Sequence, residues 1–190
     1  MLLLHRVSHV VVALVLMCIA AVSMLAFAQP EHKVTSALAQ TPVAKMVGTW
    51  KGTSWSIRPD GQRHEGPIVE RARWHLAGAA IVVEGYGHYK DEASGEFITI
   101  HEATGLIELE KDGKTVAFYA RRAGEPFVKR TLEVEGDTLR WFMDGQPGMK
   151  IRFTVTLTDT TWTEIGDMSR DDGQTWTQFL GMELTKTAAK

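Results

Sequence analysis

The chain has 190 residues, of which 44% are hydrophobic and 23% charged, and its formal net charge is −2. Lysine and arginine are scattered and form no basic run, which argues against nucleic acid or an anionic membrane surface as a partner. The single cysteine, Cys18, lies in the apolar N-terminal run, and the chain after residue 28 has none. That part of the chain can form no disulfide, use no thiol in catalysis and build no cysteine metal site.

Residues 1–28 have the pattern of a secretory signal peptide. A cationic start at Arg6 precedes an apolar run over 10–25, and the small-x-small ending predicts cleavage after Ala28. The alternative is an uncleaved transmembrane anchor, which needs about 20 apolar residues. Cys18 follows bulky residues, so lipid anchoring there is not expected. We therefore expect a periplasmic or secreted protein, with a formal charge of −3 once Arg6 is removed and with no stable membrane insertion.

Residues 29–40 lack large apolar groups in any regular period and are expected to form a flexible leader. The segment 41–47 then begins with Thr41 at a helix N-cap position and Pro42 at the first helical position. Val43 and Met46 are spaced for one apolar face, so a short N-terminal helix is predicted.

From residue 48 onward the chain consists of short β-rich runs separated by Gly- and Asp-containing turns. The predicted strands are 48–58, 66–76, 79–90, 96–110, 114–122, 128–135, 138–143, 150–158, 161–169 and 174–185. Strands so close in sequence pair with their neighbours, and ten in one twisted sheet tend to close. The prediction is an all-β, ten-stranded antiparallel meander barrel over 41–186, followed by a tail at 187–190.

Alternation along the predicted strands assigns faces to their side chains. In the second strand Ile68, Ala72, Trp74 and Leu76 share the face expected to point inward, and Glu70 lies among them. Near the end of the chain Phe153, Val155 and Leu157 form a similar inward set. These apolar residues are expected to form the core.

The stretch "VAKMVGTWKGTSW" resembles the opening of the calycin superfamily, which includes lipocalins, fatty-acid-binding proteins and ten-stranded nitrobindin-type barrels. The resemblance covers about residues 41–186 and is greatest to small secreted bacterial members. It implies that Trp50 plugs the closed end of the barrel and that Lys186, on the last strand, packs across its ring. Both residues would be structural.

Two departures from these relatives limit the ligands that the resemblance implies. The last strand, "QTWTQFLGMELTK", lacks the arginine and tyrosine with which fatty-acid-binding proteins clamp a carboxylate. No histidine follows His101, whereas nitrobindin-type barrels hold haem iron through a histidine near the C-terminus. No cofactor is therefore predicted, and haem is unsupported.

The segment "SRDDGQTW" matches the Asp-box pattern of sialidases at each defined position. The matching residues are Ser169, Asp171, Gly173, Thr175 and Trp176. Sialidases repeat this motif around a propeller, and one copy cannot build one. The pattern is therefore predicted to stabilise the hairpin between the last two strands.

Histidine and carboxylate side chains gather on the third and fourth predicted strands. Glu84, Tyr86 and His88 alternate onto one face, and His101 lies on the facing strand. These four residues are the candidate ligand-binding set. The alternative is a polar outer face exposed to water. Their spacing is not that of a zinc site, so no metal is predicted.

Five arginines on later strands leave a further choice open. They are Arg121, Arg122, Arg130, Arg140 and Arg152. They could reach inward to hold an anionic ligand or pair outside with neighbouring acids such as Glu133, Glu135 and Asp137.

Three functions fit the sequence. The first is a secreted or periplasmic lipocalin-like barrel that binds a small apolar or amphipathic ligand at the end away from Trp50. The second is an enzyme on the same barrel, using Glu84, His88 and His101 as general acids or bases on a small molecule. The third is an interaction module that presents an exposed apolar patch.

Overall fold

The computed structural model describes residues 36–58, 61–91 and 94–188. The predicted signal peptide, with Cys18, lies outside these residues, as do most of the predicted leader and the last two residues of the tail. No helix in the described ranges is both long and apolar enough to cross a membrane.

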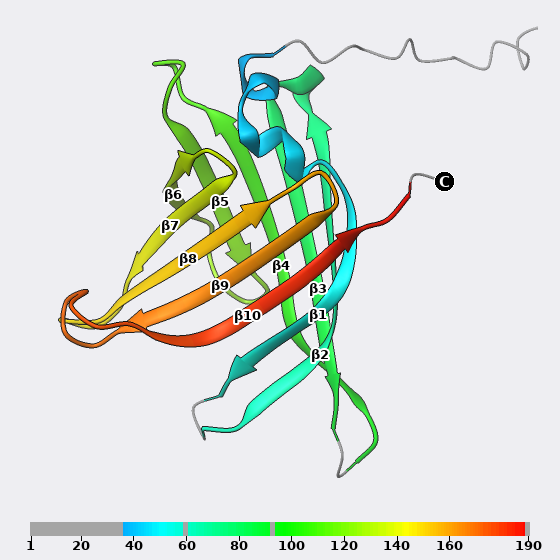
Figure 1. The fold of residues 1–190 in the computed structure, drawn as a ribbon, viewed down its shortest axis with the longest axis vertical. Helices are drawn as coiled ribbons and strands as arrows, with labels where there is room; N and C mark the ends of the chain where they lie inside the picture. The colour runs from blue at the N-terminus through cyan, green and yellow to red at the C-terminus, as the bar shows by residue number, and fades with distance from the viewer. Residues whose placement is uncertain (1–35, 59–60, 92–93, 189–190) are drawn as a thin grey trace, which may run out of the picture. The chain divides into compact units, whose positions relative to one another are not determined.

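Ten antiparallel strands form a closed barrel (Figure 1). They are β1 (Gly48–Ile57), β2 (Arg63–His75), β3 (Ala80–Lys90), β4 (Phe97–Leu109), β5 (Val116–Arg122), β6 (Val128–Glu135), β7 (Thr138–Asp144), β8 (Lys150–Leu157), β9 (Thr161–Ser169) and β10 (Thr177–Lys186). Each strand pairs with its neighbours in sequence, and β1 pairs with β10 to close the sheet. The predicted all-β meander barrel is confirmed. Closure leaves no free sheet edge.

The segment before β1 differs from its prediction. It forms two 3₁₀ turns, η1 (Ala37–Gln40) and η2 (Pro42–Met46), rather than an α-helix. With only five residues between Thr41 and Val47, too few hydrogen bonds can form to stabilise an α-helix alone. Leu38 and Val43 are buried, so the part of the predicted leader that begins at residue 36 packs as part of the barrel domain.

Alternation along the strands places the core inside the barrel, as predicted for most positions. Ile68 and Ala72 on β2 are buried, and so are Val155 and Leu157 on β8. Leu76 is the exception, with 61% of its surface exposed. Strand β2 ends at His75, and Leu76 lies in the turn η3 (Leu76–Gly78) with a positive φ of 49°, so the alternation no longer applies to it.

One end of the barrel is closed by Trp50, which is fully buried. Its indole N–H donates to the carbonyl of Met46 in η2 over 2.7 Å, and its ring meets Trp162 edge-on at 5.8 Å. Lys186 pairs with Trp50 in the sheet, and its Nζ lies 4.8 Å from the ring centroid. The same Nζ donates to the carbonyl of Lys45. The two 3₁₀ turns lie at this end, drawn in blue in Figure 1.

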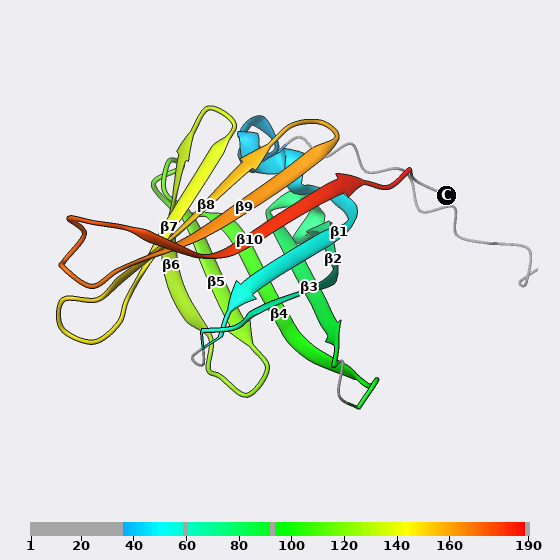
Figure 2. The same cartoon turned by 60° about the horizontal axis from the view of Figure 1, so that its bottom comes forward.

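The opposite end carries the β1–β2, β3–β4 and β5–β6 turns, which come forward in Figure 2. Up-and-down connectivity requires alternate turns to lie at the same end, so this end is the one away from Trp50.

Candidate functional site

The barrel encloses a cavity of about 450 Å³. Its lining extends from Met46 and Trp162, beside the closed end, to Arg58 and Glu125 in the turns at the opposite end. Ligand pockets in proteins commonly measure about 300–1,000 Å³. The cavity therefore has room for a small organic molecule.

Aromatic side chains form one wall of the cavity. The ring centroids of Phe118 and Trp141 lie 5.3 Å apart in an edge-on contact. Trp141 stacks on Phe153 at 5.1 Å with 13° between the planes, and Phe153 meets Phe179 at 6.1 Å. Inward positions of β5, β7, β8 and β10 bring these rings together. The wall offers faces and edges against which another planar ring can pack.

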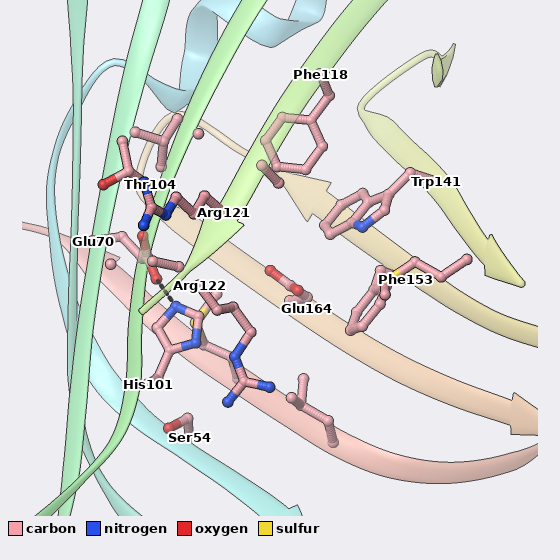
Figure 3. Close-up of a pocket in the computed structure, with 18 of the residues that line it drawn as sticks. Ser54, Glu70, His101, Thr104, Phe118, Arg121, Arg122, Trp141, Phe153 and Glu164 are labelled. Carbon is pink, nitrogen blue, oxygen red and sulfur yellow. Dashed lines mark ion pairs between the residues drawn. The ribbon is translucent and has the colours of Figure 1, made fainter. Parts of the chain in front are cut away.

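A carboxylate and an imidazole meet on the opposite wall, as Figure 3 shows. Glu70 of β2 is buried, and its Oε1 lies 3.5 Å from Nε2 of His101 on β4. Both side chains lie over the inward face of β3 at Gly85. A Cβ added at Gly85 would lie 2.4 Å from Glu70 Oε1 and 2.6 Å from His101 Nε2. The pair can therefore form because residue 85 has no side chain.

Glu164 of β9 is the third acid–base group of the cavity. Burial, together with the negative charge of Glu70, raises the pKa of its carboxyl from 4.5 to about 8. Trp162 lies two residues earlier on the same face of β9. Its indole N–H offsets part of this rise in the pKa of Glu164. The Trp162 nitrogen is buried, however, and its geometry is not that of a hydrogen bond. At neutral pH Glu164 is therefore mostly a neutral carboxylic acid.

The arginines divide between the cavity and the exterior. Arg122 and Arg130 line the cavity, and each donates to a main-chain carbonyl, that of Ile100 at 3.4 Å and that of Lys129 at 3.0 Å respectively. The Nε atom of Arg130 is buried without a partner in the described chain. Arg121 also borders the cavity at its open end, 5.7 Å from the ring of Phe127.

The remaining two arginines form ion pairs instead of lining the cavity. Arg140 pairs with Glu135 at 3.1 Å and Arg152 with Asp167 at 2.9 Å.

The structure does not bring the four predicted ligand-binding residues together. Glu84 is exposed and pairs with Arg73 of β2, and Tyr86 is exposed with its hydroxyl 3.2 Å from that of Thr99. His88 packs edge-on against Phe97, and only His101 lines the cavity.

The reason for this difference is the alternation of side chains along β3, in which the buried Ile81 and Val83 mark the inward face. Gly87 pairs with His101, a β-bulge follows, and His88 pairs with Thr99. Tyr86 pairs with Glu102. Because side chains alternate, Gly85 and Gly87 take the inward positions and Glu84 and Tyr86 point outward.

Glu164 is the cavity residue that the sequence analysis missed, although a signal was present. Trp162, Glu164 and Gly166 alternate along β9, and the buried Trp162 identifies the inward face. Glu70 was placed on the inward face but was not linked to His101. Glu70 and His101 meet across the neighbouring strand β3, whereas Glu164 of β9 joins them through closure of the barrel.

His101 is the histidine to consider for the cavity. Among the described histidines it is the one that lines the cavity, and its Nε2 faces the Glu70 carboxylate. The described residues also contain no group of three or more His, Cys, Asp or Glu side chains arranged to hold a metal ion.

The Asp-box residues stabilise the β9–β10 hairpin by hydrogen bonds. Ser169 is buried; its hydroxyl donates to Asp171 at 2.7 Å and accepts from the N–H of Gly173 at 2.8 Å. Asp171 in turn accepts from the N–H and hydroxyl of Thr175. Gly173 has φ +95°, a conformation suited to glycine, and its carbonyl accepts from the indole of Trp176. These contacts describe a structural turn.

An Asp171→Asn variant is expected to be less stable than the wild type at neutral pH. Hydrogen bonds from the Thr175 side chain, then its main-chain N–H, and from Ser169 lower the pKa of Asp171 to about 2. A lowered pKa stabilises the fold above the unfolded-state value, and that contribution is lost as pH falls through about 2. Urea unfolding should show a difference at pH 7 that shrinks between about pH 4 and pH 2.

The control for this prediction is Glu183→Gln, which alters an exposed carboxylate of β10. It should leave the stability nearly unchanged at both ends of the pH range. A deficit of Asp171→Asn that is the same at pH 7 and pH 2 would show that the charge of Asp171 does not stabilise the hairpin.

Comparisons with known proteins identify the fold only. No family model matches the chain, and no curated protein matches it. Among solved structures, Rv2717c from M. tuberculosis superposes with a TM-score of 0.56 and 14% sequence identity, over 80% of this chain and 99% of that one. A protein of unknown function from the DUF3598 family of Nostoc punctiforme PCC 73102 gives a TM-score of 0.27 and 8% identity, with the same coverage. The first likeness shows that another chain adopts a similar barrel fold.

Proposed function

We propose that this protein binds a small apolar or amphipathic molecule inside its barrel. The observation that carries the proposal is the cavity of about 450 Å³, in which an aromatic wall faces a few convergent polar groups. Binding sites for small organic molecules typically combine a mainly apolar lining with a small number of polar groups that orient the ligand. The ligand would enter at the end away from Trp50, between the β1–β2 and β5–β6 turns.

The proposal includes a cellular setting and an ancestry. The apolar segment at 10–25 and its small-residue ending support export to the periplasm or beyond, where the barrel would bind or carry its ligand. The Gly-x-Trp stretch on β1 and the packing of Lys186 over Trp50 support membership of the calycin superfamily. Because one fold serves many functions, the cavity rather than the ancestry carries the functional argument.

A cavity-filling variant tests this function. Ala120 lines the cavity on β5, and Ala120→Phe should occupy space that a ligand needs. With the neutral fluorescent probe N-phenyl-1-naphthylamine, we expect saturable binding to the wild type and an affinity at least about tenfold weaker for the variant. The control, Thr131→Phe, adds the same ring at an exposed position of β6 and should bind the probe as the wild type does.

Two results would count against ligand binding in the cavity. One is the absence of saturable fluorescence with the wild type. The other is equal affinity for the wild type and Ala120→Phe, which would place the probe elsewhere on the protein.

Acid–base catalysis is the second candidate function, and the raised pKa of Glu164 favours it. A carboxylic acid with a pKa of about 8 opposite the Glu70–His101 pair could donate a proton to a bound molecule near neutral pH. This set replaces the Glu84, His88 and His101 set that the sequence suggested. Mass spectrometry of any co-purified ligand after incubation tests it: conversion by the wild type but not by Glu164→Gln would support catalysis, and an unchanged ligand would support binding alone.

A further inference from the structure

The inner part of the cavity contains polar groups that lack protein partners. Glu164 lines the cavity, is half-buried and forms no ion pair with any described residue. Beside it, the indole N–H of Trp162 is buried and makes no hydrogen bond. Buried polar groups are almost always satisfied, and a site where they are not needs an explanation. A bound molecule that donates to Glu164 and offers an acceptor to the Trp162 indole N–H would supply both missing contacts.

The arginines of the cavity do not neutralise Glu164. A guanidinium close to a carboxylate would lower its pKa. For Glu164 the influences are burial and the charge of Glu70, which raise the pKa, and Trp162, which lowers it; no arginine contributes. Arg122 and Arg130 are instead occupied in part by main-chain carbonyls. No arginine of the described cavity lining is therefore paired with Glu164.

Glu164 lies close to the aromatic wall. In Figure 3 its carboxyl lies between the imidazole of His101 and the ring of Phe153. A planar ring packed against Trp141 and Phe153 would therefore place a substituent within reach of Glu164. Glu70, whose charge acts on Glu164, lies 3.5 Å from His101 instead.

We propose that the cavity selects a planar, ring-containing molecule with a basic nitrogen, which donates to Glu164 while its ring packs against the aromatic wall. This inference rests on the proposed function, because it specifies the ligand class for the same cavity. Binding of a protonated base would favour the ionised form of Glu164 and would form a charge-assisted hydrogen bond in a site of low polarity. The alternative is a ligand with an anionic group, which Arg122 and Arg130 would bind.

Three naphthalene probes of similar size but different charge test the inference. They are 2-naphthylmethylamine, 2-naphthylmethanol and 2-naphthoate, each titrated into the purified full chain by isothermal titration calorimetry near neutral pH. We expect the amine to bind at least about tenfold more tightly than the alcohol and the carboxylate, a difference of about 1.4 kcal/mol.

The Glu164→Gln variant should bind the alcohol as the wild type does but lose the preference for the amine. A matched control is Glu84→Gln, which removes the same charge from the outer face and should keep that preference. Tight binding of naphthoate, or an amine preference that survives in Glu164→Gln, would overturn the basic-ligand inference and leave cavity binding intact. Failure of all three probes to bind at millimolar concentration would contradict the proposed function as well.

Discussion

Replacing Glu164 by glutamine is expected to stabilise the protein increasingly as pH rises from 4.5 to about 8. The folded-state pKa of Glu164 is raised from 4.5 to about 8, so the folded chain holds a proton that the unfolded chain releases above pH 4.5. The free energy of unfolding of the wild type should therefore fall between these values and level off above about 8. Glutamine has no such titration.

The expected size of this effect is on the order of a few kcal/mol, because one pKa unit corresponds to about 1.4 kcal/mol. Glu164 faces the cavity, where water reaches its carboxyl group. The difference in the free energy of unfolding is therefore smaller than the full pKa shift would give. Urea unfolding at several pH values measures it as the difference between the variant and the wild type, so that titration of other groups cancels.

Glu84→Gln is the control for the alkaline stability of Glu164→Gln. Its carboxylate is exposed and paired with Arg73, so its stability curve should run parallel to that of the wild type across the pH range. A parallel curve for Glu164→Gln would mean that the pKa of Glu164 is not raised in the folded protein. It would then give no sign that Glu164 lacks a charged partner in the cavity.

Trp50→Ala is expected to lower the free energy of unfolding by about 3–5 kcal/mol, the usual cost of truncating a fully buried tryptophan. The variant loses the packing against Trp162 and the hydrogen bond to the Met46 carbonyl. It also leaves a hole at the closed end of the barrel. Urea unfolding at neutral pH measures the loss.

Lys186→Met distinguishes the contribution of the ammonium charge from that of packing against the Trp50 ring. Methionine keeps most of the aliphatic contact with the Trp50 ring but removes the ammonium group, so the expected loss is about 1 kcal/mol or less. A loss for Lys186→Met as large as that for Trp50→Ala would show that the charge, rather than the buried ring, stabilises the closed end.

The sequence predicted the strands well because each depends on local signals. Turns such as 112–113 and 171–173 carry Asp and Gly, and the alternation around Ile68 and Ala72 identified the inward face of β2. The short helix before β1 was wrong in type, because a five-residue segment forms a 3₁₀ turn here. Leu76 was wrong in burial, because β2 ends one residue before it.

The candidate site could not be predicted in the same way. Glu84, Tyr86 and His88 were chosen from alternation alone. The buried residues of β3 show that Glu84 and Tyr86 point outward, and a bulge shifts the pairing with β4 between Gly87 and His88. A shift of one residue in register exchanges the two faces of a strand. The number of residues in the β3–β4 turn does not reveal such a bulge.

The amino-acid sequence by itself therefore determined the fold class, the number of strands and the hairpin at the Asp-box, since these follow from periodicity and turn chemistry between neighbouring residues. Only the tertiary structure decided that Glu70, His101 and Glu164 share one cavity. These residues lie on β2, β4 and β9, and closure of the barrel between β1 and β10 brings the strands around a common interior. The raised pKa of Glu164 has the same origin, because burial and the charge of Glu70 act only across that interior.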